Sequence, residues 1–206
     1  MKKLWNLLIA GMLAFLLVGC SSYGEVEQGR VVAFNKDTME VTFIKDTTTD
    51  DMHPHHDALP ALVMKMPLDP NEIGPWPEVG LRMILDLEQH LIVMYNPETE
   101  SFDKLPFEVV SRHDNVDARK RHPLVYDATT QQMRKFPVVN SEERTVTVYS
   151  SRQKVLTTIR LAAEDFNRYD EADWAAGDEV RVYFHVDEQD QMRRFMNLTK
   201  TDFSKK

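Results

Sequence analysis

The residues best suited to chemistry lie in the segment Asp46–Leu68. It holds three of the seven histidines of the chain, His53, His55 and His56, together with aspartates and methionines. Imidazole and carboxylate groups bind zinc, copper or nickel, and thioether sulfur suits cuprous ion. The segment therefore predicts metal binding as one function of the protein.

Two alternative sets of residues could bind the metal ion. A soft ion would be bound by His53 with the pair Met64-Lys65-Met66, and a borderline ion such as zinc by His53, His55, His56 and Asp57. In either set, His53 has to come within about 2–2.5 Å of the ion.

A second interpretation treats the methionines as core residues. Leu62, Met64, Met66 and Leu68 recur with a period of two, which is typical of the buried face of a strand. Methionine fills irregular cores readily. On this interpretation, the histidines lie in an acidic loop that is idle or binds metal only weakly.

The elements around this segment predict strands. Met39, Val41 and Phe43 alternate with polar residues, and the connection that follows runs from Lys45 to about Ala61. At the matching place in the second half of the chain, the short segment 150–154 is enough to turn the chain. A long loop on a small scaffold is more often functional than a minimal turn.

The two halves of the chain share an order of features. A Val-Thr pair, Val41-Thr42 or Val146-Thr147, follows six residues after Asn35 and Asn140 respectively. Such self-similarity predicts a duplicated unit. Because each unit has about five short strands and few helical patterns, we expect a mainly β protein of two tandem small OB-like antiparallel barrels.

The expected boundaries follow from this order. They are a signal peptide at 1–19, a tether at 20–28, a first OB-like unit with the His-rich loop at 29–110, a basic linker at 111–122 and a second OB-like unit at 123–206. Charge clusters in linkers usually only hydrate, so the linker is expected to be a solvated hinge.

The N-terminus has the pattern of a secretory signal. Lys2 and Lys3 precede the apolar run Leu4–Val18, which is too short for a spanning helix. The end of the run, Leu17-Val18-Gly19-Cys20, resembles the bacterial lipoprotein box. This resemblance implies cleavage before Cys20, acylation of that cysteine and anchoring to a membrane on its periplasmic side. Ser21 then implies the outer membrane.

Composition narrows the function further. Cys20 is the only cysteine, so the mature chain has no free thiol for a disulfide or a nucleophile. Loss of Lys2 and Lys3 with the signal takes the net charge from −8 to −10, which argues against a nucleic-acid partner. The sequence shows no nucleophile–base pair, so we expect that the protein is not an enzyme.

Two further resemblances concern larger parts of the chain. Residues 29–87 resemble the small periplasmic copper and silver metallochaperones, OB-like barrels that use one histidine and a Met-x-Met pair. Ala61 stands where that family has a tryptophan, and Trp76 would have to replace it from a loop. The whole chain resembles an uncharacterised lipoprotein family of sulfate-reducing bacteria.

Together these features predict a membrane-tethered lipoprotein of the cell envelope with a structural or interaction role. On this hypothesis, a groove shared between the two units is filled by a segment of an envelope protein partner. The alternative is a periplasmic protein that binds copper, silver or zinc.

Overall fold

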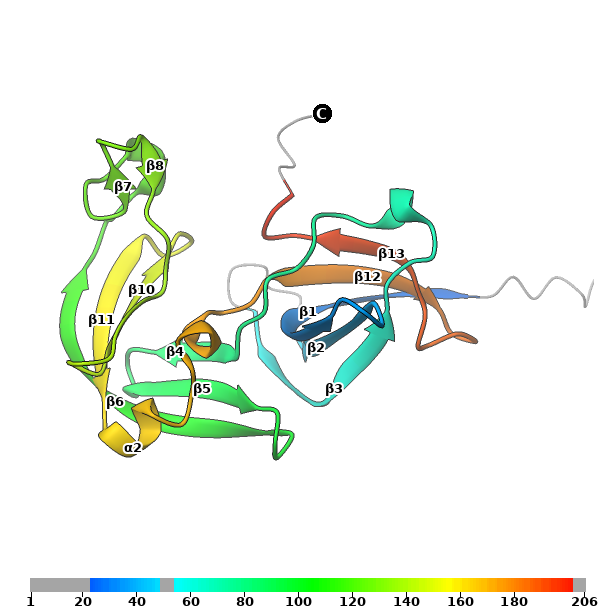
Figure 1. Cartoon of the computed structure of the whole chain (residues 1–206), viewed down its shortest axis with the longest axis horizontal. Coiled ribbons are helices and arrows are strands. Elements are labelled where there is room, and N and C mark those ends of the chain that lie inside the picture. Colours follow the sequence, from blue (N-terminus) through cyan, green and yellow to red (C-terminus); the bar gives the residue numbers. More distant parts are fainter. Residues whose placement is uncertain (1–22, 49–53, 202–206) are drawn as a thin grey trace, which may run out of the picture.

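The computed structural model describes residues 23–48 and 54–201. The fold is mainly β, with antiparallel sheets and only short helices (Figure 1). This confirms the fold class expected from the alternating apolar pattern. Within the described ranges, no helix is both long and apolar enough to cross a membrane.

The first sheet joins the two ends of the chain. Its order is β13-β12-β1-β2-β3, and β1 pairs with both β2 and β12. The strands are β1 (Gly24–Asn35), β2 (Glu40–Asp46), β3 (His56–Lys65), β12 (Glu179–His185) and β13 (Met192–Asn197). We call it the five-stranded sheet.

The second sheet is built from the middle of the chain, in the order β4-β5-β6-β11-β10-β9. The strands are β4 (Arg82–Asp86), β5 (Leu91–Asn96), β6 (Ser101–His113), β9 (Val138–Asn140), β10 (Thr145–Ser150) and β11 (Val155–Leu161). We call it the six-stranded sheet. A small hairpin, β7 (Tyr126–Asp127) and β8 (Gln132–Met133), projects from it (Figure 1).

The expected division into tandem units 29–110 and 123–206 is therefore wrong. Strands β12 and β13, expected in the second unit, pair with β1, while β4 to β6 belong to the same sheet as β9 to β11. The six-stranded sheet is thus inserted between β3 and β12. Both sheets also have open strand orders rather than closed barrels.

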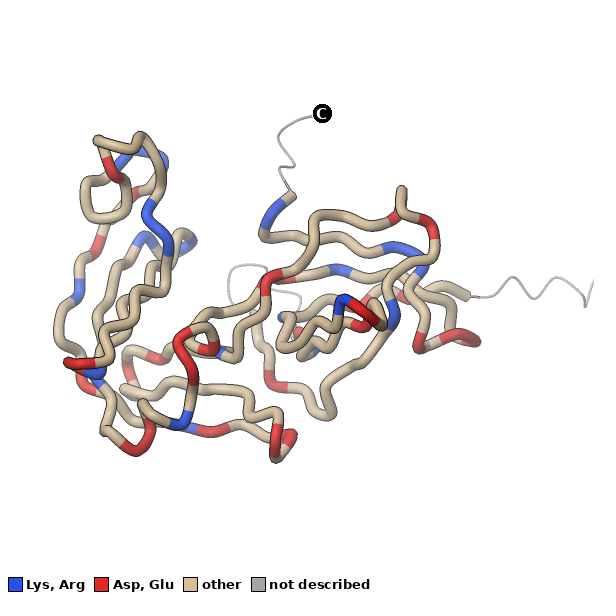
Figure 2. Tube along the Cα trace, viewed as in Figure 1, with Lys and Arg blue, Asp and Glu red and all other residues tan. Residues whose placement is uncertain are grey.

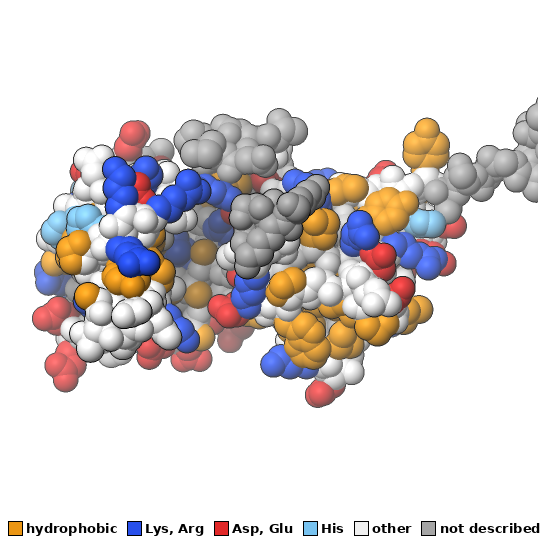
Figure 3. Space-filling model, turned by 90° about the horizontal axis from the view of Figure 1, so that it is seen from above, with side chains coloured by type: hydrophobic (Ala, Val, Ile, Leu, Met, Phe, Trp, Pro, Cys, Tyr) orange, Lys and Arg blue, Asp and Glu red, His pale blue; other side chains and the backbone are white. Residues whose placement is uncertain are grey.

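The segment 111–122 is not a linker between units. Its first residues end β6, and Val116 is fully buried with Val125 and Leu156. The short helix η2 (Ala118–Lys120) follows, and its two basic residues, Arg119 and Lys120, are exposed. Figure 3 shows Lys and Arg side chains gathered at the end of the molecule that carries β7 and β8. The connections between the two sheets are the segments 66–81 and 162–178.

A recurring turn explains the self-similarity of the sequence. The side chains of Asn35 and Asn140 each accept hydrogen bonds from the N–H groups two and three residues further on. In both turns the residue four positions on, Met39 or Arg144, has a positive φ. The same turn forms at Asp86, Asn96 and Asp127. Asn and Asp favour such turns because they mimic a backbone acceptor. The chain thus repeats a hairpin rather than a domain.

Two hydrophobic cores lie on opposite faces of β1 and β2. Val31 and Phe43 point into the core of the five-stranded sheet, whereas their neighbours Val32 and Ile44 join the larger core with the six-stranded sheet. Successive side chains of a strand point to opposite faces, so β1 and β2 serve both cores. This arrangement fixes the two sheets against each other.

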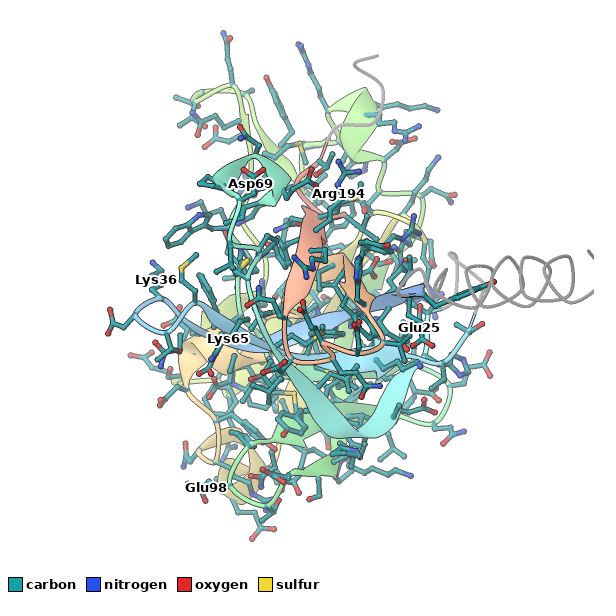
Figure 4. All side chains as sticks on the ribbon, turned by 90° about the vertical axis from the view of Figure 1, so that its right-hand side faces the viewer. Glu25, Lys36, Lys65, Asp69, Glu98 and Arg194 are labelled. Carbon is teal, nitrogen blue, oxygen red and sulfur yellow. The ribbon has the colours of Figure 1, made fainter. Side chains whose placement is uncertain are left out.

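Side-chain charges tie the first connection to the five-stranded sheet. The short helix η1 (Pro70–Glu72) follows β3, and Arg194 on β13 forms an ion pair with Glu72. Figure 4 shows Arg194 beside the segment that carries Asp69. Next to this ion pair, the main chains of Ile73 and Phe195 form an isolated parallel β-bridge.

The second connection carries the short helices α2 (Ala163–Phe166) and η3 (Glu171–Trp174). Trp174 is fully buried and packs against Phe166 and Tyr169, with ring centroids 5.6 Å away in each case. A large aromatic residue at this place contributes much of the apolar burial of the connection. Trp174 therefore anchors the segment that leads back to the five-stranded sheet.

Candidate functional site: an arginine-lined cleft between the sheets

The candidate site is a cleft of about 610 Å³ where the two sheets meet. Its walls come from β1, β4 and the β10–β11 hairpin, from the residues just before β3 and just after β13, and from the segment that leads into β12. Its charged residues are Arg30, Arg82, Arg152 and Glu179. The chain has an excess of acidic residues, which are frequent at its tight turns (Figure 2), so a cleft with three arginines and one carboxylate is a local reversal of charge.

Arg30 has a structural role. Its Nη1 donates to the carbonyl oxygen of Met83 at 2.7 Å and to that of Arg82 at 3.3 Å, and its Nη2 donates to Glu179 at 3.3 Å. Burial lowers the pKa of Arg30, while Glu179 opposes this effect. Arg30 thus joins β1 of one sheet to β4 of the other.

Arg152 extends from the β10–β11 hairpin to the same carboxylate. Its Nη2 donates to Glu179 at 2.6 Å, and its side chain is 40% exposed. Glu179 therefore balances two arginines at once. The Glu179 carboxylate cannot neutralise both, so the cleft keeps positive charge.

Arg82 differs from the other two arginines. Its Nε donates to the main-chain carbonyl oxygen of Trp174 at 3.1 Å, and within the described part of the chain its terminal nitrogens have no hydrogen bond and no acidic partner. Burial and the charge of Arg30 lower the pKa of Arg82 to about 9. The side chain is only partly buried, so its terminal nitrogens stay accessible from the cleft, and no described acidic group neutralises their charge.

Arg82 also faces a second, smaller cavity of about 260 Å³. This cavity shares Val148, Tyr149 and Gly177 with the main cleft. The Arg82 side chain therefore lies where the two cavities adjoin, in contact with solvent-accessible space on either side.

Of the two described histidines of the predicted segment, His55 and His56, only His55 lines this cleft. His55 lies there next to Pro54, whereas His56 on β3 is only 1% exposed. Burial, with the charges of Arg30 and Arg152, lowers the pKa of His56 to about 3. His56 is therefore neutral at physiological pH, and among the described residues neither of its ring nitrogens has a hydrogen-bond partner.

The structure places the methionines elsewhere. Met64 and Met66 are 3% and 2% exposed and pack in the core of the five-stranded sheet with Val41 and Phe43. The interpretation of these residues as core is thereby confirmed. Neither sulfur lies in the wall of the arginine-lined cleft.

The remaining residues of the predicted metal sets are only partly described. Asp57 accepts a hydrogen bond from the Thr47 hydroxyl at 2.8 Å. His53 lies outside the described residues, as does Cys20. Among the residues that the structure does describe, no group of three or more His, Cys, Asp or Glu could hold a metal ion. Both ligand sets remain predictions.

The arginines were not singled out from the sequence, although a signal was present. Arg30 directly precedes the apolar run Val31-Val32, and Arg82 lies inside the strand pattern Leu81–Leu87. Arginine is rarely buried unless it is paired. A charged residue within an apolar strand therefore marks a candidate site, but only the fold brings these two strands together with Arg152.

Comparison with known proteins gives a family without an assigned activity. Residues 22–206 match the family model described as "Domain of unknown function (DUF4881)". The chain therefore belongs to this family. No curated protein and no solved structure matches it.

Proposed function

We propose that the protein is a membrane-tethered, non-enzymatic binding protein of the cell envelope that holds a segment of a partner protein in the arginine-lined cleft. The observation that carries this proposal is the position of β4. It is an edge strand of the six-stranded sheet, and three consecutive residues, Met83, Ile84 and Leu85, line the cleft.

Consecutive lining residues identify the edge of the strand as the exposed side. Alternate residues of a strand point to opposite faces, so a cavity against one face would be lined by every second residue. On the edge of β4, the Arg82 N–H already donates to Ala175, and the carbonyl oxygens of Arg82 and Met83 accept from Arg30. The part of the edge that is left for an extended segment is therefore 84–86, where such a segment can add to the sheet as a further strand. The apolar residues Val148 and Val155 on the facing hairpin would cover such a segment.

Site-specific photo-crosslinking in the native cell tests the binding role. A photoreactive residue at Leu87, in the cleft, should give a discrete adduct with one envelope protein, to be identified by mass spectrometry. The control position is Val63, which is 56% exposed and lies outside the cleft wall. No adduct from Leu87, or the same adducts from both positions, would contradict the proposal.

The tether rests on Cys20 and the signal pattern that precedes it. Two or more acyl chains would hold the protein stably at a membrane, because each buried methylene contributes about 0.8 kcal/mol. Cell fractionation of Cys20→Ser is the test. We expect this variant to move from the outer-membrane fraction to a soluble one, and unchanged membrane association would exclude the lipid anchor.

Metal binding by the His-rich segment stays the second candidate function. Titration of Cys20→Ser with cuprous, silver and zinc ions tests it directly. A soft-metal affinity that is lost in His53→Ala would support the first ligand set. An affinity that His53→Ala leaves unchanged would remove that set.

A further inference from the structure

We infer that Arg82, assisted by Arg152, binds an oxyanion, a carboxylate or a phosphate group, of the ligand that occupies the cleft. This inference deepens the proposed function and rests on it. It assigns the chemical class of the ligand and the residue that recognises it.

Arg82 has hydrogen-bond donors that no described residue of the protein accepts. Its Nε is held by the carbonyl oxygen of Trp174 at 3.1 Å, which fixes the plane of the guanidinium. The two terminal nitrogens keep their donors, because within the described ranges neither has a protein partner. Such a pair of parallel N–H groups matches the two oxygens of a carboxylate or phosphate.

The carboxylates around Arg82 already pair with other residues. Among the described residues that line the cleft, Glu179 is the only carboxylate, and it already pairs with Arg30 at 3.3 Å and Arg152 at 2.6 Å. The smaller cavity is lined by two further carboxylates, Glu78 and Asp178. Lys200 pairs with both, at 3.0 Å and 3.3 Å, and Asp178 also accepts a hydrogen bond from Asn197 at 2.7 Å. No carboxylate of the described protein is thus left for Arg82, and an anionic ligand would supply one.

The surroundings of Arg82 strengthen an ionic contact. The guanidinium lies between the two sheets, and apolar residues such as Leu85, Val148 and Val155 share the cleft with it. Charge-assisted hydrogen bonds are stronger where water is partly excluded. The same residues would accept an apolar part of the ligand next to its oxyanion.

Isothermal titration of the full chain carrying Cys20→Ser tests the inference. The probes are succinate and inorganic phosphate, with neutral succinamide as the matched control. We expect succinate or phosphate to bind in a 1:1 ratio and succinamide not to bind. Tighter binding of succinate would identify a carboxylate source for the ligand, and tighter binding of phosphate a phosphate source.

Three substitutions locate the site. Arg82→Lys keeps the charge but loses the parallel N–H pair, and should weaken the affinity at least tenfold. Arg152→Met, on a half-exposed turn, should weaken it about threefold or more without unfolding the chain. Arg112→Met is the control, because Arg112 is exposed and, among the described residues, pairs with Asp114 alone.

Two results would overturn the inference. One is the absence of binding by both anions, and the other is an affinity that neither Arg82→Lys nor Arg152→Met changes. Neither result would remove the crosslinked adduct from Leu87. The chemical class of the ligand and the binding role of the cleft are therefore tested separately.

Discussion

Arg82 donates a hydrogen bond from Nε to the main-chain carbonyl oxygen of Trp174, at 3.1 Å. Trp174 is fully buried between Phe166 and Tyr169, so the carbonyl has a fixed position. The segment that returns the chain to the five-stranded sheet thereby orients the one arginine of the cleft that has no acidic partner in the described protein. Fold and candidate site are linked at this contact.

Substitution of Trp174 should therefore affect both stability and binding. We expect Trp174→Ala to lower the free energy of unfolding by about 3–5 kcal/mol, the usual cost of removing a buried aromatic side chain. Denaturant unfolding measures this change. Trp174→Phe is the control: because the indole N–H has no partner among the described residues, it should cost much less. Equal losses in both variants would show that the aromatic packing is not what matters.

The stability should fall on acidification because of His56. The pKa of this side chain is about 3 in the folded protein, against 6.5 as its ordinary value. The unfolded chain therefore binds the proton more tightly, so the contribution of His56 is complete above about pH 6.5 and is lost as the pH falls toward 3. At about 1.36 kcal/mol per pKa unit, the loss is roughly 5 kcal/mol at most.

Unfolding measured at several pH values in His56→Leu tests this expectation. The variant should lose most of the pH dependence between pH 6.5 and 4, whereas His113→Leu, at an exposed position, should keep it. Carboxylates such as Asp103, whose pKa is lowered by hydrogen bonds from Tyr169 and Arg168, act at lower pH. An unchanged pH profile in His56→Leu would contradict the assignment.

Met64 separates the core interpretation from the metal-binding one. Because its side chain is buried, Met64→Ala should cost about 2–5 kcal/mol in unfolding free energy, while Met64→Leu should cost less than about 1.5 kcal/mol. Silver titration of Met64→Leu gives the second measurement. A stable Met64→Leu variant that loses tight silver binding would favour the metal site over a purely structural methionine.

Much of the local structure could be predicted from the sequence. The alternation of Val41 and Phe43 does mark a strand whose alternate side chains enter one core, whereas Met39 lies in the turn before it and packs against the same core. The chain also turns directly after Asn35 and Asn140, and asparagine is a residue type that favours turns. These features depend on neighbouring residues, so a short window of sequence contains them.

The long-range pairing could not be predicted in the same way. The hairpins at Asn35 and Asn140 are alike because the same turn chemistry forms both, and this similarity carries no information about which strands pair across the chain. Strand β1 pairs with β12, so that Gly29 lies opposite Val180. Such a pairing depends on the packing of the whole fold.

The candidate site was missed for the same reason. Arg30, Arg82 and Arg152 come from three distant parts of the chain, and only the insertion of one sheet into the other brings them to one cleft. In the sequence, the dense cluster of histidines is the more conspicuous feature, because its members are neighbours along the chain. Of these, His55 does line the cleft, so the predicted segment adjoins the site without forming it.

The most direct test of an oxyanion site at Arg82 and Arg152 is an NMR titration that follows the arginine side-chain Nε–H signals while succinate or phosphate is added. We expect saturable shifts of the Arg82 and Arg152 signals, while the Arg112 signal stays unchanged. The Arg82 signal is assigned by its absence in Arg82→Lys. Small, uniform shifts of all arginine signals that do not saturate would contradict an oxyanion site in the cleft.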